Sequence, residues 1–371
     1  MEDRIDSAVL VAGARPNFMK IAPVLRALER RAITCHLVHT GQHYDEQMSE
    51  VFFTDLGLRH PDHHLEIGSG SHAEQTGRTM IAFEPLLASL AAHVVVTVGD
   101  VNATIACSLV AAKADVLVAH VEAGLRSRDW SMPEEVNRVA TDRVSDYLFA
   151  PSEDAVDNLR AEGYRDDQIH LVGNVMVDSL LDNLERARAS STLRELELTA
   201  GGYGVVTLHR PANVDDPAVL LALMEALDTV SADLPLVFPV HPRTRGRLAD
   251  AGYRGPVRLL EPQGYLHFLA LQAGAALVLT DSGGVQEETT MLGVPCLTLR
   301  DNTERPITIE HGTNQLVGRD PQRIIAAARH VLAHGVPARR PPLWDGHAAD
   351  RIAEVLVAGG TAAQRLRPTS C

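Results

Sequence analysis

Short apolar runs rich in valine, leucine and alanine alternate with segments of helical periodicity along most of the chain. Continuous apolar runs bounded by turn residues are typical of strands buried in a parallel sheet, and alternation of strands with helices predicts a doubly wound α/β sheet. In the first half, the pattern predicts strands over residues 7–11, 35–39, 94–98, 116–121 and 147–150, and helices over residues 16–30, 45–56, 103–113 and 133–145.

The alternation starts again after a helix predicted over residues 175–188. Strands are then predicted over residues 204–208, 234–240, 257–260, 276–280 and 295–299, and helices over residues 216–231 and 264–274. We therefore expect two Rossmann-like α/β domains that face each other across a cleft, over residues 1–172 and 173–347. A last helix, predicted over residues 348–358 of a tail that spans 348–371, fits either domain and is a candidate for packing back on the first.

Charge and cysteine content narrow the class of partner. The chain has 371 residues with 34 lysines and arginines against 48 aspartates and glutamates, a net charge of −14. This acidic balance argues against nucleic acid and anionic membranes as partners, although a local basic pocket can still hold a small anion. Four scattered cysteines without metal-binding spacing are typical of a reduced, cytoplasmic protein. We interpret the short apolar N-terminal run as a strand rather than a signal peptide, and no apolar stretch reaches the ~18 residues of a spanning helix.

Two basic residues follow the first predicted strand. Ligands of doubly wound sheets bind outside the carboxyl ends of the parallel strands, so residues after each strand are candidates for a site. Arg15 and, about one turn later, Lys20 stand in this position. They are either a pair that meets a phosphate group or an ordinary loop arginine and a solvated lysine, and the spacing favours neither interpretation.

Three carboxylates follow the next strands of the first half. Asp100 comes after the strand at 94–98, where capping of the following helix is the commonest role of an aspartate. Glu122 ends the strand at 116–121, and a carboxylate there is costly unless it is paired or used, which favours a functional role. Glu134 stands in the first turn of the next helix, where an i,i+4 ion pair with Arg138 is the alternative to a role in a site.

Basic residues also mark the strand ends of the second half. His209 and Arg210 follow the strand at 204–208, and adjacent histidine and arginine side chains suit an anion. His241 follows the next strand, and Arg305 lies in a charged stretch after the last strand. All four are candidates for binding an anionic ligand, although a lone histidine is more often structural.

The strand at 276–280 runs through an aspartate into Ser282, Gly283 and Gly284 and then into a helix. A hydroxyl and bare backbone N–H groups at a helix N-terminus can bind phosphate oxygens. Glu288 lies four residues past Gly284, roughly 5–6 Å deeper along the helix axis. At that distance a carboxylate can accept hydrogen bonds from both ribose hydroxyls. The stretch therefore predicts a binding site for a nucleoside diphosphate.

Short motifs of one family occur in order over nearly the whole chain. They are GARPNFMK (13–20), TGQHYD (40–45), VGDVNAT (98–104), HVEAGLR (120–126), MPEEVNR (132–138), FAPSE (149–153), VGN (172–174), TLHRPANVD (207–215), TDSGGVQEE (280–288) and RDNTERP (300–306). With these motifs the chain resembles the non-hydrolysing UDP-N-acetylglucosamine 2-epimerases. The resemblance implies two Rossmann-like domains of the glycosyltransferase-B type, a homodimer, and neither a metal nor a nicotinamide cofactor.

The resemblance also implies a reaction, the reversible conversion of UDP-N-acetylglucosamine to UDP-N-acetylmannosamine. UDP is eliminated to leave a 2-acetamidoglucal, and it adds back with the C2 proton delivered to the opposite face. The C2 proton becomes removable only as the C1–O bond breaks, so the reaction needs cations at the departing diphosphate and carboxylates near C2. By position in the motifs, the acid and base residues are Asp100, Glu122 and Glu134. The residues assigned to the UDP are His209, Arg15, Lys20, Arg210, Ser282, Gly283, Gly284 and Glu288.

Several alternatives remain open at the level of sequence. Some bacterial members of the family bind a second UDP-N-acetylglucosamine as an activator, and Gln42, His43 and His241 match that site loosely. The substrate is UDP-N-acetylglucosamine or another UDP-2-acetamido sugar. Other functions compatible with the same motifs are a UDP-sugar-dependent glycosyltransferase, a hydrolysing epimerase that releases N-acetylmannosamine, and a catalytically silent sensor of nucleotide sugars.

Overall fold

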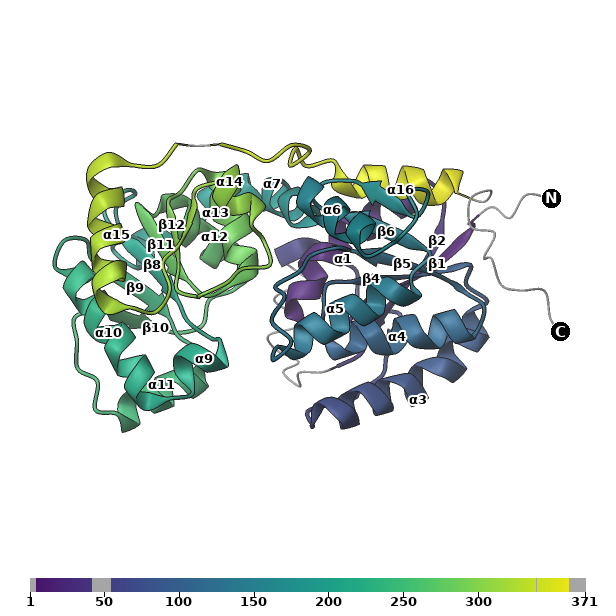
Figure 1. The fold of residues 1–371 in the computed structure, drawn as a ribbon, viewed down its shortest axis with the longest axis horizontal. Coiled ribbons are helices and arrows are strands. Elements are labelled where there is room, and N and C mark those ends of the chain that lie inside the picture. The colour runs from purple at the N-terminus through teal and green to yellow at the C-terminus, as the bar shows by residue number, and fades with distance from the viewer. Residues whose placement is uncertain (1–4, 42–54, 338, 360–371) are drawn as a thin grey trace. The chain divides into compact units, whose positions relative to one another are not determined.

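The computed structural model describes residues 5–41, 55–337 and 339–359 (Figure 1). The chain divides into two compact units: unit 1 comprises Met1–Ser179 and Pro342–Cys371, and unit 2 comprises Leu180–Pro341. The helix predicted over residues 45–56 lies almost entirely outside the described residues, as do Gln42 and His43. None of the described helices is both long enough and apolar enough to cross a membrane.

Unit 1 is built on a parallel sheet with the strand order β3-β2-β1-β4-β5-β6-β7. Its strands are β1 (Ser7–Ala12), β2 (Thr34–His39), β3 (His63–His64), β4 (Val94–Val98), β5 (Leu117–Val121), β6 (Tyr147–Ala150) and β7 (Ile169–Leu171). Its helices are α1 (Arg15–Glu29), α3 (His72–Leu90), α4 (Asn102–Lys113), α5 (Pro133–Val144), α6 (Glu153–Ala161) and α16 (Ala348–Ala358), and α7 (Val175–Arg188) runs on into unit 2.

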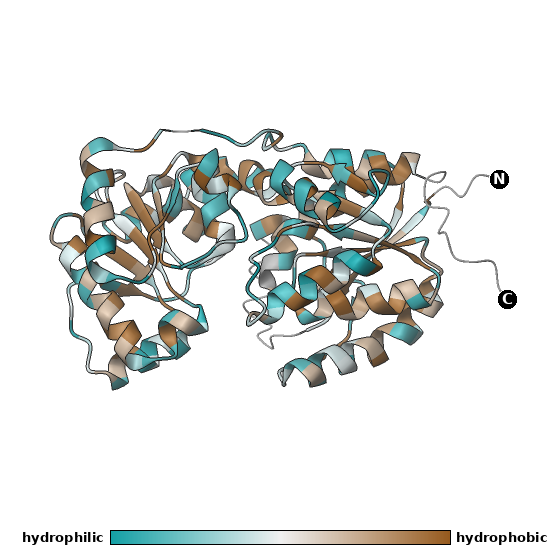
Figure 2. Cartoon of the chain, in the orientation of Figure 1, coloured by the Kyte–Doolittle hydropathy of each residue, from teal (hydrophilic) through white to brown (hydrophobic). Residues whose placement is uncertain are grey.

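Helices α3 and α4 cover one face of this sheet. Phe83 and Leu87 of α3 and Cys107 of α4 pack with Val9 and Val95 of the sheet in one buried apolar cluster. The strands are apolar on both faces because helices cover both, and Figure 2 shows them brown between helices with teal outer surfaces. This double cover explains why the strands appear in the sequence as unbroken valine runs.

The final helix α16 completes unit 1 by packing against α1. Its first backbone N–H groups, at Ala348 and Ala349, donate to the buried carboxylate of Asp178 at 3.2 and 2.7 Å. Asp350 accepts a hydrogen bond at 2.9 Å from Arg31, in the turn that follows α1. A carboxylate at a helix N-terminus satisfies free N–H groups and interacts favourably with the helix dipole, so these contacts fix α16 on the first unit.

Unit 2 has a second parallel sheet, with the strand order β10-β9-β8-β11-β12-β13. Its strands are β8 (Gly204–Thr207), β9 (Leu236–Pro239), β10 (Arg258–Leu260), β11 (Leu277–Thr280), β12 (Cys296–Thr298) and β13 (Asn314–Leu316). Its helices are α8 (Thr192–Glu195), α9 (Pro211–Val214), α10 (Pro217–Ser231), α11 (Pro242–Asp250), α12 (Tyr265–Gly274), α13 (Gly283–Leu292), α14 (Ile307–Glu310) and α15 (Pro321–His334).

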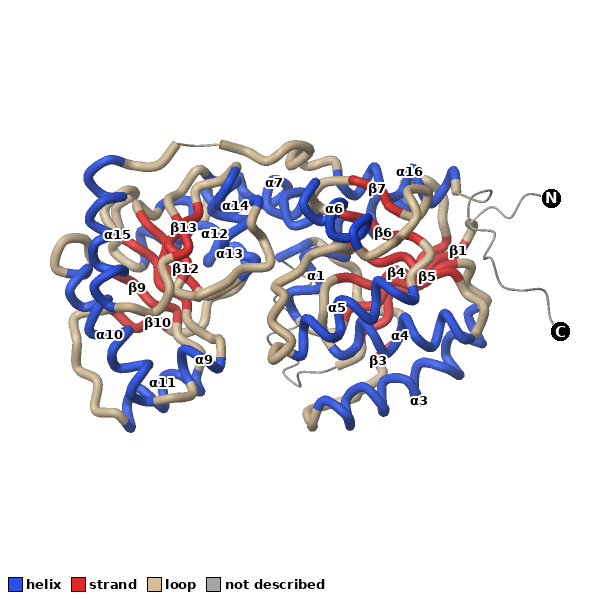
Figure 3. Tube along the Cα trace, viewed as in Figure 1, coloured by secondary structure: helices blue, strands red, loops and turns tan. Residues whose placement is uncertain are grey.

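The two faces of this sheet carry separate apolar clusters. Leu223 and Leu227 of α10 pack with Ile324 of α15 on one face. Leu271 of α12 and Val285 of α13 belong to the cluster on the other face. Figure 3 shows the strands of each unit as a red layer between blue helices. Two Rossmann-like α/β domains are thus confirmed, as the strand–helix alternation predicted.

In each sheet the strand order reverses at one point, between β1 and β4 in unit 1 and between β8 and β11 in unit 2. The crevice outside the carboxyl ends of such strands is where doubly wound sheets bind ligands. The described strands and helices that the pattern predicted lie within two residues of their expected ends. The pattern did not predict the helices α3, α6, α11 and α15, however, or the single-turn helices α8, α9 and α14, and it omitted the short edge strands β3, β7 and β13.

Candidate functional site

Asn17 joins the carboxyl ends of the two central strands of unit 1. Its Oδ1 accepts hydrogen bonds from the backbone N–H groups of Gly13 and Ala14 at 3.1 and 2.8 Å. Its Nδ2 donates to the carbonyl oxygen of Val98 at 3.2 Å. These bonds hold the loop after β1 against the end of β4. They therefore fix the first turn of α1 beside the point where the strand order reverses.

One turn into α1, Lys20 forms a buried ion pair with Glu122, which follows β5. Both side chains are more than nine-tenths buried. Gly99 lies against this pair, because a Cβ atom at residue 99 would stand 3.0 Å from Lys20 Nζ and 3.5 Å from Glu122 Oε2. Lys20 is therefore not a solvated helix lysine, and the structure brings together two candidates from separate motifs.

The backbone of Glu122 adopts the left-handed region, with φ of +71°. For a residue with a Cβ atom this conformation costs about 1–3 kcal/mol, and such residues cluster at functional sites. The N–H groups of Glu122 and Ala123 both donate to the carbonyl of Phe149 at 3.1 Å, which holds the strained turn in place. Glu122 Oε1 is buried and has no hydrogen-bond partner among the described residues. A buried acceptor without a partner is costly, so this oxygen is available to a ligand.

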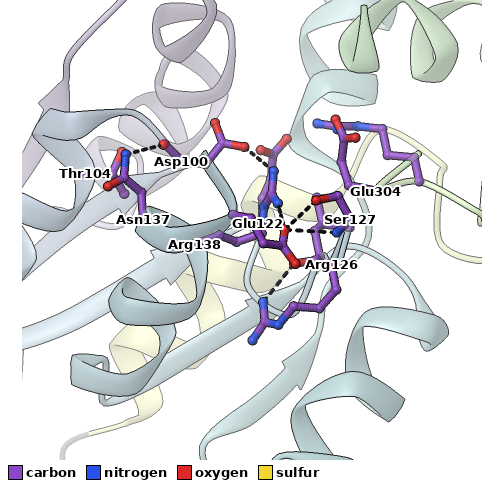
Figure 4. A network of polar contacts seen from close by, with 12 residues as sticks. Asp100, Thr104, Glu122, Arg126, Ser127, Asn137, Arg138 and Glu304 are labelled. Atoms are coloured by element: carbon purple, nitrogen blue, oxygen red, sulfur yellow. Dashed lines mark hydrogen bonds and ion pairs between the residues drawn. The ribbon is translucent and has the colours of Figure 1, made fainter. Parts of the chain in front are cut away.

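Asp100 is paired with Arg138, and Figure 4 shows this ion pair beside Glu122. The predicted alternative for Asp100, capping of the next helix, is wrong, because α4 has Val101 at its N-cap and no side-chain cap. The alternative i,i+4 pair between Glu134 and Arg138 is also wrong. The buried guanidinium of Arg138 instead contacts Glu135, three residues away, together with Asp100.

Glu135 fixes the loop that leads from β5 into α5. Its carboxylate accepts hydrogen bonds from the backbone N–H and hydroxyl of Ser127 at 2.9 and 3.0 Å and from the N–H of Arg128 at 2.8 Å. Glu134, its neighbour in the first turn of α5, is half-buried and takes no part in this network. Arg15 begins α1, and its side chain lies outside the described part of the structure.

In unit 2, Asp281 is the centre of the loop contacts at the strand-order reversal. It follows β11, is fully buried, and accepts from the backbone N–H of His209 at 3.0 Å, from that of Arg210 at 2.9 Å and from Asn213 Nδ2 at 3.1 Å. It also lies 2.8 Å from Nδ1 of His209. Although burial favours the neutral carboxylic acid, these donors hold the pKa of Asp281 below its ordinary value.

The contact with Asp281 determines which nitrogen of His209 can react. Because the carboxylate accepts at Nδ1, that nitrogen carries a hydrogen and Nε2 is the nitrogen left for a ligand. The His209 side chain is 54% exposed, so Nε2 can meet one. His241 differs, since its Nδ1 accepts from the N–H of Arg243 at 3.2 Å and the residue is the N-cap of α11.

Gly283 opens α13 against a buried group of arginines and glutamates. A Cβ atom at this residue would stand 2.4 Å from Arg305 Nη1 and 2.7 Å from Glu304 Oε1. Arg305 is held by Glu304 at 2.6 Å and by Glu287 at 2.7 Å. Gly283 is thus required by close packing, in addition to any contact with phosphate. The adjacent Ser282 is the N-cap of α13, but its side chain makes no capping hydrogen bond.

The same group of charges includes Arg210 and Arg300. Arg300 donates to Glu304 at 2.8 Å, and Arg210 lies 3.6 Å from it. Burial disfavours the charged form of Glu304, yet Arg305 and Arg300 lower the pKa of this carboxyl well below its ordinary value. The group has three arginines against the two glutamates Glu287 and Glu304, and this excess of positive charge beside a helix N-terminus favours an anionic ligand.

Glu288 lies in the middle of α13 and is buried. Gln272 Nε2 donates to its Oε2 at 2.6 Å. Burial is the main reason that the pKa of the Glu288 carboxyl is raised to about 7, and the nearby Glu287 carboxylate contributes to this increase. In the absence of a ligand, this side chain is therefore partly a neutral carboxylic acid at neutral pH.

Sequence reasoning missed the side chains that hold the candidates in place. Asp281 and Glu135 stand inside motifs that were singled out, but neither was given a role, and Arg138 was considered only as an ion-pair partner of Glu134. Asp281 had a usable signal, since an aspartate between a buried strand and a Ser-Gly-Gly turn is itself a carboxylate at a strand end. The partner of Arg138 depends on the direction in which α5 leaves its loop, which no local pattern encodes. Among the described residues, no group of three or more His, Cys, Asp or Glu side chains is arranged to hold a metal ion.

Comparison with known proteins agrees with this arrangement. A family model described as UDP-N-acetylglucosamine 2-epimerase matches residues 26–357. The UDP-N-acetylglucosamine 2-epimerase of Methanocaldococcus jannaschii is 43% identical over 361 residues, which cover 94% of this chain and 98% of that protein. The UDP-2,3-diacetamido-2,3-dideoxy-D-glucuronate 2-epimerase of Pseudomonas aeruginosa is 42% identical over 350 residues, with 93% and 98% covered.

A solved structure is similar over the same extent. The crystal structure of the Methanocaldococcus jannaschii UDP-GlcNAc 2-epimerase in complex with UDP-GlcNAc and UDP matches with a TM-score of 0.89, covering 95% of this chain and 100% of that chain. The matched family model, the two relatives and this structure all cover most of the sequence. The chain therefore belongs to the UDP-N-acetylglucosamine 2-epimerase family.

Proposed function

We propose that the protein interconverts UDP-N-acetylglucosamine and UDP-N-acetylmannosamine by eliminating UDP to a 2-acetamidoglucal and adding it back. Membership of the family and the similarity to a structure with UDP-GlcNAc and UDP support this reaction. The observation that carries most weight is the strained, buried Glu122 with its unpartnered Oε1, next to the paired carboxylate of Asp100. A protein that only bound UDP would have no use for either carboxylate.

The carboxylates of unit 1 are proposed to move the C2 proton. Asp100 and Glu122 are the acid and base groups, with Glu134 as the third candidate. Lys20 holds Glu122, and Arg138 holds Asp100, so both act as oriented carboxylates. Proton delivery to either face of C2 needs more than one such group, which is the reason for proposing a set rather than a single base.

The strand-order reversal of unit 2 is proposed to hold the UDP. His209, with Nδ1 occupied by Asp281, presents Nε2 to the diphosphate, and Arg210 and Arg305 add positive charge. Arg15 and Lys20 are proposed to assist from α1. Ser282, Gly283 and Gly284 supply donors at the start of α13, and Glu288 binds the ribose hydroxyls. Stabilising the departing diphosphate lowers the barrier to C1–O cleavage, on which removal of the C2 proton depends.

Deuterium exchange tests the proposed reaction directly. The protein is incubated with UDP-N-acetylglucosamine in D2O, and proton NMR follows C2 and the appearance of the manno epimer. We expect deuterium at C2 in both epimers, because elimination and re-addition pass through a planar C2. Binding of the sugar nucleotide without exchange, or release of UDP only in the presence of an acceptor sugar, would exclude the reaction.

Two substitutions separate the roles of the two units. Glu122→Gln should reduce exchange by on the order of 10²-fold or more and leave the Kd of UDP nearly unchanged. Glu288→Ala should instead raise the Kd of UDP, measured by calorimetry. An unchanged Kd in Glu288→Ala would rule out the ribose contact.

A second candidate substrate has a specific observation in its favour. The Pseudomonas aeruginosa relative named for UDP-2,3-diacetamido-2,3-dideoxy-D-glucuronate is 42% identical to this chain, against 43% for the relative named for UDP-N-acetylglucosamine. The chemistry at C1 and C2 is the same in both sugars. Comparing kcat/KM for the two substrates in the same exchange assay determines which one the protein prefers.

The assembly and cellular location are part of the same proposal. We expect a homodimer, which light scattering would show as twice the chain mass of 40.1 kDa. We expect the protein in the cytoplasm, and cell fractionation would test this. A monomer that is fully active in dilute solution would contradict the proposed dimer.

A further inference from the structure

We infer that His120 is a positioning residue: its ring is held as an imidazolium that fixes the carbonyl of Gly99 and thereby places Asp100 relative to Glu122. The inference rests on the proposed function of those two carboxylates. His120 lies within β5 and is fully buried, so it does not contact the substrate itself.

Both ring nitrogens of His120 face acceptors. Nδ1 lies 2.6 Å from Oδ1 of Asp142, and Nε2 lies 2.8 Å from the carbonyl oxygen of Gly99. A backbone carbonyl can only accept, and so can an ionised carboxylate. Each nitrogen must therefore carry a hydrogen, which makes the ring doubly protonated.

The charges around His120 are compatible with that state. Asp142 is fully buried and also accepts from Arg126 at 2.7 Å and from the N–H of Gly124 at 3.1 Å. Arg126 in turn donates two hydrogen bonds to Glu162, at 2.8 and 2.7 Å. The chain of contacts thus contains two carboxylates, and Arg126 supplies one positive charge. An imidazolium at His120 supplies the second, and the exposed Glu162 at the far end of the chain of contacts is also stabilised by solvent.

Gly99 transmits the position of His120 to the candidate site. Its N–H donates to the carbonyl of Val121 at 3.1 Å, and its carbonyl accepts from His120, so β5 holds both sides of this residue. Gly99 has φ of +66° and packs against Lys20 Nζ and Glu122 Oε2. Asp100 is the next residue along the chain. His120 therefore fixes the peptide bond between Gly99, which lies against the Lys20–Glu122 pair, and Asp100.

Two substitutions remove one contact of His120 each. The amide nitrogen of asparagine reaches about as far as Nδ1, so His120→Asn keeps a donor for Asp142 and loses the bond to Gly99. The amide nitrogen of glutamine reaches about as far as Nε2, so His120→Gln keeps a donor for Gly99 and loses the bond to Asp142. Each variant serves as the matched control for the other.

The inference predicts that the variant with the lower activity, His120→Asn, is the more stable of the two. In His120→Asn, kcat for C2 exchange should fall on the order of tenfold to a hundredfold, with the Kd of UDP unchanged, because displacement of a catalytic group by a fraction of an ångström is enough. His120→Gln should keep most of kcat but have the lower Tm of the two, because a buried carboxylate has lost a donor. Activity that simply follows Tm in both variants, or full activity in both, would overturn the inference.

A spectroscopic measurement tests the inference without using the reaction. In protein labelled with ¹⁵N-histidine, the His120 signals are assigned by their absence from the His120→Gln spectrum, and both ring nitrogens should be protonated at pH 7. In a second sample, labelled uniformly with ¹⁵N, the amide signal of Asp100 should shift in His120→Asn and stay in place in His120→Gln. A ring with one unprotonated nitrogen would overturn the inference. If the wild-type protein exchanges no deuterium at C2, the proposed function fails, and these signals still decide the role of His120.

Discussion

Relative to the wild type, the variant Glu288→Gln should gain free energy of unfolding at pH 8 compared with pH 5. Glu288 is a buried carboxyl whose pKa is raised to about 7, mainly by burial. A carboxyl with a raised pKa in the folded state holds its proton more tightly there than in the unfolded chain. Stability is therefore highest below the unfolded pKa and is lost as pH rises towards the folded pKa. Glutamine does not titrate, so Glu288→Gln removes this loss.

The magnitude follows from the two pKa values. The folded value of about 7 and the ordinary value of 4.5 differ by about 2.5. At about 1.36 kcal/mol per unit, full ionisation costs about 3.4 kcal/mol of the free energy of unfolding. Some of this cost is already present at pH 5, because the unfolded carboxyl is largely ionised there. The change between pH 5 and pH 8 is about 2.5 kcal/mol.

Urea denaturation at the two pH values measures this change. Any fixed packing effect of the new amide is the same at both pH values, so it cancels when the pH 5 result is subtracted from the pH 8 result. Tyr265, next to Glu288, can accept from the amide. Glu310→Gln, at an exposed residue that ends α14, is the matched control and should show no pH-dependent difference from wild type. If the difference in free energy of unfolding between Glu288→Gln and the wild type were the same at both pH values, the pKa of the buried carboxyl would not be raised. That result would refute the reasoning.

Three further substitutions test other contacts. Asp281→Asn removes the carboxylate that fixes the tautomer of His209, so kcat should fall on the order of 10²-fold or more while the ligand-free fold persists; an unchanged rate would show that His209 needs no such partner. Gly283→Ala places a methyl group against the pinned guanidinium of Arg305 and should lower the free energy of unfolding by about 1–3 kcal/mol, measured in urea, whereas a neutral effect would mean that Arg305 moves freely. Asp178→Ala leaves the first N–H groups of α16 without their acceptor and should cost about 1 kcal/mol or more, with faster amide hydrogen exchange in α16 as the specific readout.

The sequence was informative wherever a local rule decided the structure. Valine runs such as residues 94–98 predicted buried strands because helices cover both faces of the sheet. Rules for ligand binding at strand ends then singled out Glu122 and His209 as candidates without any knowledge of their neighbours. The helix α3 was missed because its apolar residues run directly into those of the next strand, so no boundary was visible.

The partners of the candidate residues could not be predicted in the same way. Lys20 meets Glu122, and Arg138 meets Asp100, across distances of 102 and 38 residues along the chain. Such pairings depend on the order of strands in the sheet, which brings β1, β4 and β5 side by side. Helical spacing suggested Glu134 as the partner of Arg138. Glu135 is the residue that contacts it instead, because the loop before α5 binds to the Glu135 carboxylate.

The return of the chain to unit 1 has a consequence for biosynthesis. Unit 2 is inserted between Ser179 and Pro342, and α16, which covers part of α1, is made last. As the chain leaves the ribosome from its N-terminus, the surface of α1 that α16 will cover therefore stays exposed while unit 2 is synthesised. Unit 2 is complete at residue 341, before the last helix of unit 1 has been made, although unit 2 begins later along the chain. A stop codon after residue 341 would spare the sheet of unit 2 and leave unit 1 without its last helix.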